Sequence, residues 1–349
     1  MKAPGIESTP APKTAISGDA GRDQDPFSAL EQELTEGLRR YWEAAGHIMD
    51  GSGIHLSEPT AEIFSLKRNF FSALFLYSYF RCGIRPERRI LYAAVNQCLR
   101  GMVTGCDNLL DDEYKVTLET DLPDTATRFR SVLDIMVSER VLFELMLSQA
   151  VRPGITLDDA REAVRKSLHA LTLSGAQEAS EEAGFKGRRL RPEAVLANVH
   201  HYKTGLLFQC PWAVPRVLEQ PSPVGAEMVT GALYRIGIGC QILDDMVDLV
   251  RDVKTSRHNY VASMVEWSGE EEKRHLLAEL AVSQYTEGLE MALRDTHREA
   301  YDVAIGYLND GMGQLLLEEH RVFADMAVGV IVERIGADRL VVPQRRGSV

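Results

Sequence analysis

Apolar residues that recur three and four positions apart dominate the chain from Pro26 onward. In the first such segment, FSALEQELTEGLRRYWEAAG, this spacing places the large apolar side chains on one side of a helix. Eight further segments have the same pattern, and they span residues 61–81, 86–111, 125–150, 157–179, 192–218, 223–250, 270–294 and 297–335. None of them shows the alternation or the β-branched clusters of a β-strand. The pattern predicts an all-α fold, a single large bundle of long helices.

The first 25 residues differ from the rest of the chain. They are rich in Pro, Gly, Ala, Ser and Thr and have almost no large apolar side chains. Such a segment cannot bury enough surface to offset the entropy of ordering it, so we expect residues 1–25 to be disordered. No later stretch has the composition of a linker. We therefore expect residues 26–349 to form one domain.

The chain has 349 residues, of which 45% are hydrophobic, and its formal net charge is −12. An acidic protein gains nothing from the counterions that nucleic acid releases on binding, so the charge argues against nucleic acid as a partner. The same charge would repel an anionic substrate. If the substrate carries phosphate groups, divalent cations must bridge them to carboxylates of the protein.

The cysteines and the hydropathy pattern indicate where in the cell the protein is located. The five cysteines are odd in number and show no CxxC spacing, so we interpret them as small buried apolar residues in a reducing environment. The sequence has no signal peptide at its start and no uncharged run long enough to span a bilayer. We expect a cytoplasmic protein without a transmembrane segment.

An acidic cluster, DNLLDDE, stands at the end of the segment 86–111. Its Asp107 and Asp111 are four residues apart and therefore project from one face of a helix. Like charges at this spacing repel each other, and acidic residues at a helix C-terminus oppose the helix dipole. A divalent cation is the simplest compensation, with Asp112 as a further candidate ligand. The alternative is a solvated helix end.

A second acidic cluster, QILDDMVD, continues an apolar, glycine-bearing segment. Asp244 and Asp248, followed by Asp252, form a stripe at positions i, i+4 and i+8, and Asp245 stands beside it. An acidic stripe on a core-forming helix is difficult to explain as surface decoration. Two such clusters, each at the end of a core helix, favour a metal site over two solvated surfaces.

The sequence HHYKTG, residues 200–205, lies between the two clusters. Lys203 and Thr204 offer a point charge and a hydroxyl group, which suit a phosphate. The vicinal His200 and His201 are an alternative candidate for a transition-metal site, but no further His or Cys at ligand spacing supports it.

These motifs, in this order, resemble those of the trans-isoprenyl diphosphate (polyprenyl) synthases over most of residues 64–252. The segment DNLLD, 107–111, is similar to the DDxxD motif of the family, with Asn108 in place of its second aspartate. The segment CQILDDMVD, 240–248, resembles the second motif, FQxxDDxxD. Lys203 and Thr204 match a lysine-threonine motif, and the segment GAQ that ends at Gln177 resembles a Gly-Gln pair.

The resemblance implies a helical bundle around a deep central cavity. Three Mg²⁺ ions would join the acidic motifs to the diphosphate of an allylic substrate. Asp107 and Asp111 would bind two of the ions, and Asp244, with help from Asp248, would bind the third. Members of this family are usually homodimers, so a homodimer is expected.

The resemblance also implies how the substrate is held. Lys203 would grip the diphosphate, while Gln241 and Thr204 would face the carbocation that forms when the C–O bond breaks. Lys115, Gln177 and Arg257 are further candidate contacts to the substrate. For Arg257, a polar surface loop is an equally good interpretation.

The residues that would bind a second substrate, isopentenyl diphosphate, depart from the family pattern. The basic motif GGKRxRP is similar here to SLKRNFF, 65–71, which keeps Lys67 and Arg68 but has Phe70 where an arginine is expected. Arg100 stands at the position of a histidine and would restore one positive charge. An Arg-Arg pair after the first acidic motif is absent, and Lys115 is the only cation there.

Three functions remain open. A prenyltransferase that condenses an allylic diphosphate with isopentenyl diphosphate is favoured by four retained residues, Lys67, Arg68, Lys203 and Gln241. An enzyme like a terpene cyclase, which acts on one prenyl diphosphate, is favoured by Phe70, Asn108 and the missing Arg-Arg pair. The chain could also be a silent subunit of a heteromeric synthase. We expect the transferase, on the frequency of that activity in the superfamily.

Overall fold

The computed structural model describes residues 26–111, 114–151, 154–219, 222–282 and 289–341. Within these residues helices dominate, and the one β-contact is an isolated bridge between Leu56 and Thr120. The predicted all-α fold is therefore confirmed. The long helices are α1 (Pro26–Met49), α3 (Pro86–Leu110), α4 (Thr127–Ala150), α5 (Leu157–Glu181), α8 (Pro223–Val247) and α13 (Arg294–Leu315).

Shorter elements connect the long helices. They are η1 (Ala61–Phe64), α2 (Phe70–Arg81), α6 (Pro192–Val195), η2 (Leu196–Gly205), η3 (Leu207–Trp212), α7 (Ala213–Leu218), α9 (Leu249–Lys254), α10 (Tyr260–Trp267), α11 (Glu271–Val282), α12 (Leu289–Ala292), η4 (Glu318–Phe323), α14 (Ala324–Ile335) and α15 (Asp338–Val341).

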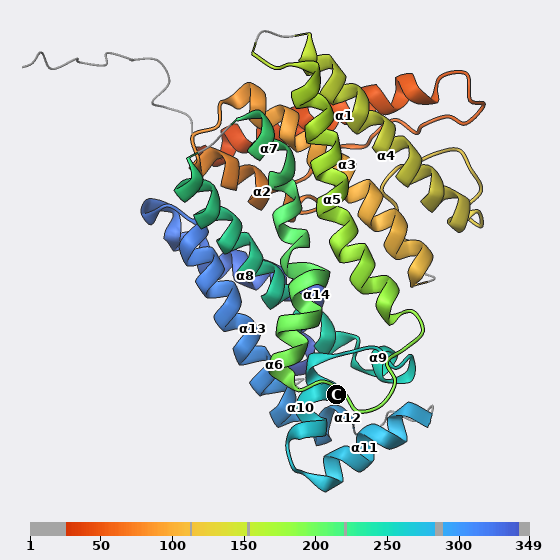
Figure 1. Cartoon of the computed structure of the whole chain (residues 1–349), viewed down its shortest axis with the longest axis vertical. Coiled ribbons are helices and arrows are strands. Elements are labelled where there is room, and N and C mark those ends of the chain that lie inside the picture. The colour runs from red at the N-terminus through yellow and green to blue at the C-terminus, as the bar shows by residue number, and fades with distance from the viewer. Residues whose placement is uncertain (1–25, 112–113, 152–153, 220–221, 283–288, 342–349) are drawn as a thin grey trace, which may run out of the picture.

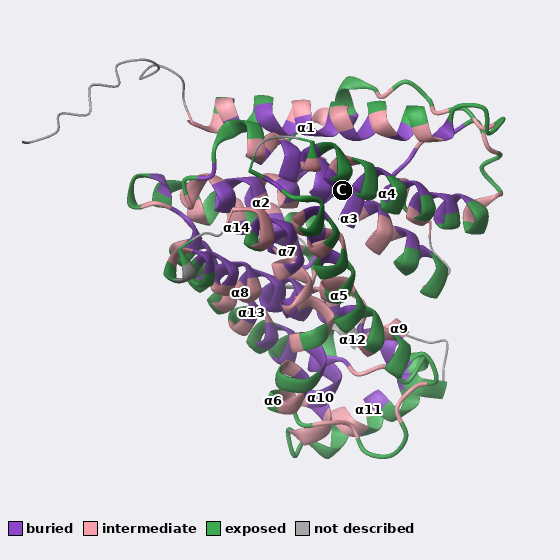
Figure 2. Cartoon of the chain, turned by 45° about the horizontal axis from the view of Figure 1, so that its top comes forward, coloured by how far each residue is buried: buried purple, intermediate pink, exposed green. Residues whose placement is uncertain are grey.

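The long helices form two packed groups. In the first group α3 contacts α1 and α4, and α4 contacts α5. In the second group α8 packs along α13 and contacts η2, and Figure 1 shows α8 and α13 side by side along one side of the molecule. Figure 2 shows that α1 turns buried residues inward and exposed residues outward. This is the amphipathic packing that the apolar periodicity predicts.

Two of the predicted helices are interrupted by side chains that bind the backbone. In the segment 61–81, Asn69 donates from Nδ2 to the carbonyl oxygens of Ile63 at 2.7 Å and Ser65 at 3.0 Å, which ends η1 before α2 begins. In the segment 297–335, the N–H of Leu317 donates to the hydroxyl of Tyr77 at 3.0 Å. Because the N–H of Leu317 is engaged by Tyr77, it cannot continue the hydrogen bonds of α13. The helix therefore ends, and η4 begins as a separate helix.

The predicted segment 192–218 changes helical type along its length. Residues 196–205 form a π-helix, η2, which carries Lys203 and Thr204. Pro211 lies inside the following 3₁₀ turn, η3. Since π-helical turns redirect side chains and often occur at functional sites, this departure from regular α-helix is relevant to the site.

Gly237 brings the second acidic cluster close to η2. A Cβ atom at this position of α8 would lie 2.8 Å from the carbonyl oxygen of Thr204. Only glycine therefore permits this approach of the two backbones. Gln241 follows Gly237 by about one helical turn, so the same contact places Gln241 beside Thr204.

Several predictions lie beyond what the structure describes or tests. Residues 1–25, 112–113 and 342–349 lie outside the described residues. The single domain over 26–349 and the homodimer stay predictions. Among the described helices, none has both the length and the apolar character needed to cross a bilayer.

Candidate active site

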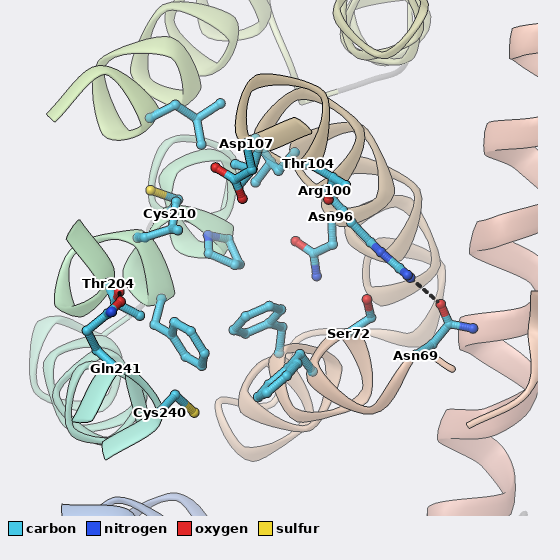
Figure 3. A pocket seen from close by; sticks show the side chains of 18 of the residues that line it. Asn69, Ser72, Asn96, Arg100, Thr104, Asp107, Thr204, Cys210, Cys240 and Gln241 are labelled. Atoms are coloured by element: carbon cyan, nitrogen blue, oxygen red, sulfur yellow. Dashed lines mark hydrogen bonds between the residues drawn. The ribbon is translucent and has the colours of Figure 1, made fainter. Parts of the chain in front are cut away.

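A cavity of about 430 Å³ lies between the two groups of helices. Its walls come from α2, α3, η2, η3 and α8, and the end of α14 adds Arg334 and Ile335. Figure 3 shows polar side chains of α3 facing Thr204 and Gln241 across this space. The cavity therefore joins residues that are far apart in the sequence.

One face of α3 supplies a row of polar residues to the cavity. Asn96, Arg100, Thr104 and Asp107 all line it, and their spacing of three or four residues places them on one side of the helix. At a rise of 1.5 Å per residue, the row extends over about 16 Å from Asn96 to Asp107. Asp111, one turn further, is the residue that ends α3.

On the opposite wall, Asp244 and Gln241 of α8 line the cavity together with Thr204 of η2. Thr204 donates from Oγ1 to Gln241 Oε1. Gln241 Nε2 in turn donates to Asp245 Oδ1 at 3.0 Å and to Asp244 Oδ2 at 3.3 Å. This chain of hydrogen bonds fixes the amide of Gln241 and turns it toward Asp244.

Asp245, predicted as a metal ligand, is buried behind this wall. Besides the bond from Gln241, its Oδ2 accepts from His200 Nε2 at 2.9 Å and from the N–H of Tyr260 at 2.5 Å. Burial opposes the charge of Asp245, but the contact with His200 and the other donors keep its pKa below the ordinary value. Asp245 thus joins α8 to η2 and α10.

The two carboxylates of the cavity are held in an unfavourable environment. Burial, then the charges of Glu178 and Asp111, raise the pKa of Asp107 to about 6. Burial, then the charges of Asp248 and Asp245, raise the pKa of Asp244 to about 6. Asp107 stands at the open side of the cavity, while the surrounding protein desolvates its carboxylate. This end of the cavity would gain from an added cation.

Lys203 is paired with an acidic residue that the sequence analysis did not single out. Its Nζ lies 3.1 Å from Glu178 Oε1, on α5. Burial acts to lower the pKa of Lys203, but Glu178, Asp245 and Asp244 outweigh burial and raise it above the ordinary value. Lys203 is therefore a fixed positive charge beside the acidic end of the cavity.

Two arginines form hydrogen bonds with aspartates of the two acidic clusters. Arg257 Nη1 donates to Asp111 Oδ1 at 2.8 Å. Arg251 Nη2 donates to Asp248 Oδ2 at 2.5 Å and lies 4.0 Å from Asp111 Oδ2. The two predicted metal-binding clusters thus meet through these cations.

A second set of arginines forms what we call the arginine side of the cavity, and its Arg100 lies about two helical turns along α3 from Asp107. Arg68, Arg100 and Arg334 all line it. Burial, then the charges of Arg68 and Arg334, lower the pKa of Arg100 to about 10, so it stays charged at neutral pH. Arg100 Nη1 donates to Asn69 Oδ1 at 2.9 Å, a neutral acceptor. Three arginines that repel one another along one wall are an environment suited to an anion.

The rest of the lining is apolar and aromatic. Phe208 packs edge-on against Phe71 and Phe75, with ring centroids 5.5 Å and 5.8 Å apart. All three residues line the cavity, as do Leu99 and Leu207. A hydrocarbon chain would find matching surface here.

Comparison with known proteins gives a match in structure and none in sequence. No known family model matches the sequence, and no curated protein is significantly similar to it. The geranylgeranyl pyrophosphate synthetase of Pyrococcus horikoshii superposes with a TM-score of 0.57 at 16% identity, over 88% of this chain and 96% of that one. The chain has a trans-isoprenyl diphosphate synthase-like fold.

Two more structures agree with this assignment. The polyprenyl synthetase of Streptomyces coelicolor gives a TM-score of 0.56 at 16% identity, over 91% of this chain and 100% of that one. A structure described as a geranylgeranyl pyrophosphate synthase gives a TM-score of 0.65 at 12% identity, over 88% of this chain and 99% of that one. Identities this low show a shared isoprenyl synthase-like fold, and the activity of this chain has to be argued from its own residues.

Within the isoprenyl synthase-like fold, several predicted residues lie away from the cavity. Lys67 is exposed, and its carbonyl oxygen, not its side chain, binds Arg334. Gln177 Nε2 donates to Glu181 Oε1 at 3.1 Å. Lys115 is exposed at the surface, although its charge still lowers the pKa of Asp107 slightly against the larger opposing effects. Asp112 lies outside the described residues.

Asn108, which replaces the second aspartate of the first motif, has a structural role. Its side chain is buried, and its Nδ2 donates to the carbonyl oxygen of Lys115 at 3.0 Å. Its Oδ1 accepts from the N–H of Lys115 at 2.8 Å. An aspartate could not make the first bond, since an ionised carboxylate only accepts. Asn108 thus holds the chain that follows α3 in place.

The donor set fits Mg²⁺ if the substrate supplies further ligands. Among the described residues, no three His, Cys, Asp or Glu side chains form a ready-made metal cluster. Mg²⁺ is commonly held by one or two carboxylates together with water and substrate phosphates, so a complete cage is not required. Burial and then neighbouring carboxylates raise the pKa values of Asp107 and Asp244, so a bound cation would stabilise their charged forms.

Proposed function

We propose that this protein is a Mg²⁺-dependent prenyltransferase that joins an allylic diphosphate to isopentenyl diphosphate. One observation supports this most directly. A single cavity is lined by Asp107 and Asp244, which come from opposite walls at its acidic end, and by Arg68, Arg100 and Arg334 on its arginine side. An enzyme that joins two diphosphates needs two separate anion sites. The aspartates would bind one diphosphate through Mg²⁺, and the arginines would bind the other directly.

The allylic diphosphate would bind at the acidic end. Asp107, Asp111 and Asp244 would hold Mg²⁺, with Asp248 beside them, and we leave Asp245 out of the proposed ligand set because donors engage both of its oxygens. The bound metal would supply positive charge that stabilises the departing diphosphate. The family resemblance gives three ions as the expected number.

Residues of η2 and α8 would position the reacting carbon. Lys203 would contact the diphosphate as a point charge while Glu178 holds its side chain at the acidic end. Thr204 and Gln241 present their polar atoms to the cavity beside Asp244. Their oxygens would stabilise the positive charge that develops at the allylic carbon when its C–O bond breaks.

Isopentenyl diphosphate would bind at the arginine side. The anion would relieve the mutual repulsion of Arg68, Arg100 and Arg334 that lowers the pKa of Arg100. Arg334 replaces some of the positive charge lost where Phe70 stands. The double bond of isopentenyl diphosphate would then attack the allylic carbon, and a proton would leave the resulting cation. The apolar walls would exclude water from this step.

A terpene cyclase remains the second candidate. It is favoured by the aromatic wall of Phe71, Phe75 and Phe208, because ring faces can stabilise a cation that moves along a single chain. A cyclase binds one diphosphate and needs one anion site, whereas this cavity offers both the acidic end and the arginine side, and for this reason we favour transfer.

Product analysis tests the proposal. The protein is incubated with geranyl, farnesyl and geranylgeranyl diphosphates and Mg²⁺, with and without isopentenyl diphosphate. We expect a longer prenyl diphosphate, formed only when both substrates are present. A hydrocarbon or alcohol formed without isopentenyl diphosphate would select the cyclase. Failure to convert any of these substrates, together with no Mg²⁺-dependent binding of diphosphate, would indicate a silent subunit.

A further inference from the structure

Asn96 places an unusual polar group deep in the cavity. Its side chain is only 4% exposed, and it lines the cavity about 16 Å along α3 from Asp107. Figure 3 shows the amide projecting from α3 into the open space. Its Nδ2 has no hydrogen-bond partner. A buried polar group without a partner is costly, so this amide requires an explanation.

The hydroxyl group of Tyr79 decides which way the amide faces. Its oxygen lies 2.8 Å from the carbonyl oxygen of Pro211 and 3.1 Å from Oδ1 of Asn96. Both of these partner atoms are acceptors, whereas a phenol has a single proton to donate. Burial raises the pKa of Tyr79, so the phenol keeps that proton. Only one of the two contacts can therefore be a bond donated by Tyr79.

The carbonyl oxygen of Pro211 is the preferred acceptor for the proton of the Tyr79 hydroxyl group. An α-helical bond to it would come from the N–H of residue 215, but residue 215 is a proline and has no N–H. Pro211 also has the shorter contact to Tyr79. When the proton points to Pro211, the Tyr79 oxygen can only accept a bond from Asn96. The NH₂ group of Asn96 must then be the part that faces Tyr79.

We infer that Asn96 turns its NH₂ group to Tyr79 and its side-chain oxygen to the cavity, and that this oxygen binds a hydroxyl group on the distal part of the substrate chain. This orientation of the Asn96 amide gives the NH₂ group a hydrogen-bond partner. It leaves only the side-chain oxygen unpaired, and protein interiors tolerate an unpaired carbonyl oxygen better than an unpaired N–H. The inference rests on the proposed function, because the prenyl chain would extend from the acidic end along α3.

The surroundings select the class of ligand group. A plain hydrocarbon cannot use an acceptor, and a full positive charge would be repelled by Arg100, one turn away on the same face. A neutral O–H group can donate to the side-chain oxygen of Asn96 and is not repelled by Arg100. The same O–H could come from a trapped water molecule, which a substrate hydroxyl would merely replace.

Binding of matched substrate analogues tests the inference. The probes are geranyl, farnesyl and geranylgeranyl thiodiphosphates, each with and without a hydroxyl group on its terminal methyl, measured by calorimetry with Mg²⁺. For the chain length that reaches Asn96, we expect the hydroxylated probe to bind the wild type about 5-fold to 10-fold more tightly, the effect of one hydrogen bond of about 1 kcal/mol.

Three variants identify the source of this preference. Asn96→Leu should abolish it, and Tyr79→Phe should reduce it because the amide is then free to turn. Thr104→Val, on the same face of α3, is the matched control and should keep it. Circular dichroism confirms that each variant is folded. If Asn96→Leu is not folded, the Tyr79→Phe variant decides.

Three outcomes would overturn the inference. If no probe gains affinity from its hydroxyl group, the acceptor subsite is absent or holds water. If the preference persists in Asn96→Leu, or is unchanged in Tyr79→Phe, another group provides it. A separate titration with inorganic diphosphate distinguishes a failure of the hydroxyl subsite at Asn96 from a failure of the proposed function. Normal Mg²⁺-dependent binding there with no hydroxyl effect removes this inference alone, whereas no binding removes the proposed function as well.

Discussion

Arg257 donates a hydrogen bond of 2.8 Å to Asp111, and this contact connects the end of α3 to the chain that follows α9. Arg251 lies 4.0 Å from the other oxygen of the same carboxylate. Cations of the protein itself thus contact the carboxylate that we propose for Mg²⁺. A metal ion that binds Asp111 has to compete with these guanidinium groups.

Substitution of Arg257 by alanine should separate metal binding from diphosphate binding. We expect Mg²⁺ alone to bind Arg257→Ala about tenfold more tightly, because a charge-assisted hydrogen bond to Asp111 is removed. Diphosphate with Mg²⁺ should bind more weakly, since the freed guanidinium would otherwise contact phosphate oxygens. Lys254→Ala, an exposed cation on α9, is the control for lost charge. Unchanged Mg²⁺ affinity in Arg257→Ala would contradict the competition.

The raised pKa of Asp244 gives a prediction for stability. A carboxyl group whose pKa is about 6 in the folded protein and 3.8 otherwise binds more protons in the folded state between these values. The stability of the metal-free protein should therefore fall as the pH rises from about 4 to about 6. Asp244→Asn removes the charge, so at neutral pH we expect a higher Tm, by roughly 1–2 °C for about 1 kcal/mol.

The same variant should lose function while it gains stability. Turnover and Mg²⁺-dependent diphosphate binding should both fall strongly in Asp244→Asn, because an amide is a poor ligand for Mg²⁺. Thermal unfolding at about pH 5 and about pH 7.5 checks the first part. A Tm lower than wild type at both pH values would show that the charged Asp244 stabilises the fold and would contradict the assignment.

The arginine side of the cavity gives a prediction for kinetics. Arg100→Ala and Arg334→Ala should each raise the KM for isopentenyl diphosphate about tenfold or more, and leave the KM for the allylic substrate nearly unchanged. Arg339→Ala, an exposed arginine on the neighbouring α15, is the matched control. If both KM values rise together, these arginines belong to the ionisation site and the two-site account is wrong.

The local patterns were sufficient to predict the all-α class. Asp107, Asp244, Gln241 and Thr204 line one cavity, and their roles in binding stay predictions. They could be found because each stands in a short motif on its own helix. The helix 260–267 was missed because its residues sit between two short loops and give no long apolar period.

Other parts of the site depend on contacts that no local pattern contains. Arg334 reaches the cavity because the end of α14 contacts the segment that precedes α2, where Arg334 donates to the carbonyl oxygens of Lys67 and Arg68. Glu178 gave a weak signal as an acid beside Gln177, but its pairing with Lys203 depends on the packing of α5 against η2. The burial of Asp245 likewise follows from tertiary contacts.

The central claim is that Asp107, Asp111 and Asp244 together bind a diphosphate through Mg²⁺. Calorimetric titration of inorganic diphosphate into the wild type and into Asp107→Ala, Asp111→Ala and Asp244→Ala, with and without Mg²⁺, tests it most directly. We predict binding to the wild type only with Mg²⁺, and a loss of at least about 100-fold in each variant, with helical circular dichroism intact. Equal affinity in the wild type and the Asp244→Ala variant, or binding that does not need Mg²⁺, would contradict the claim.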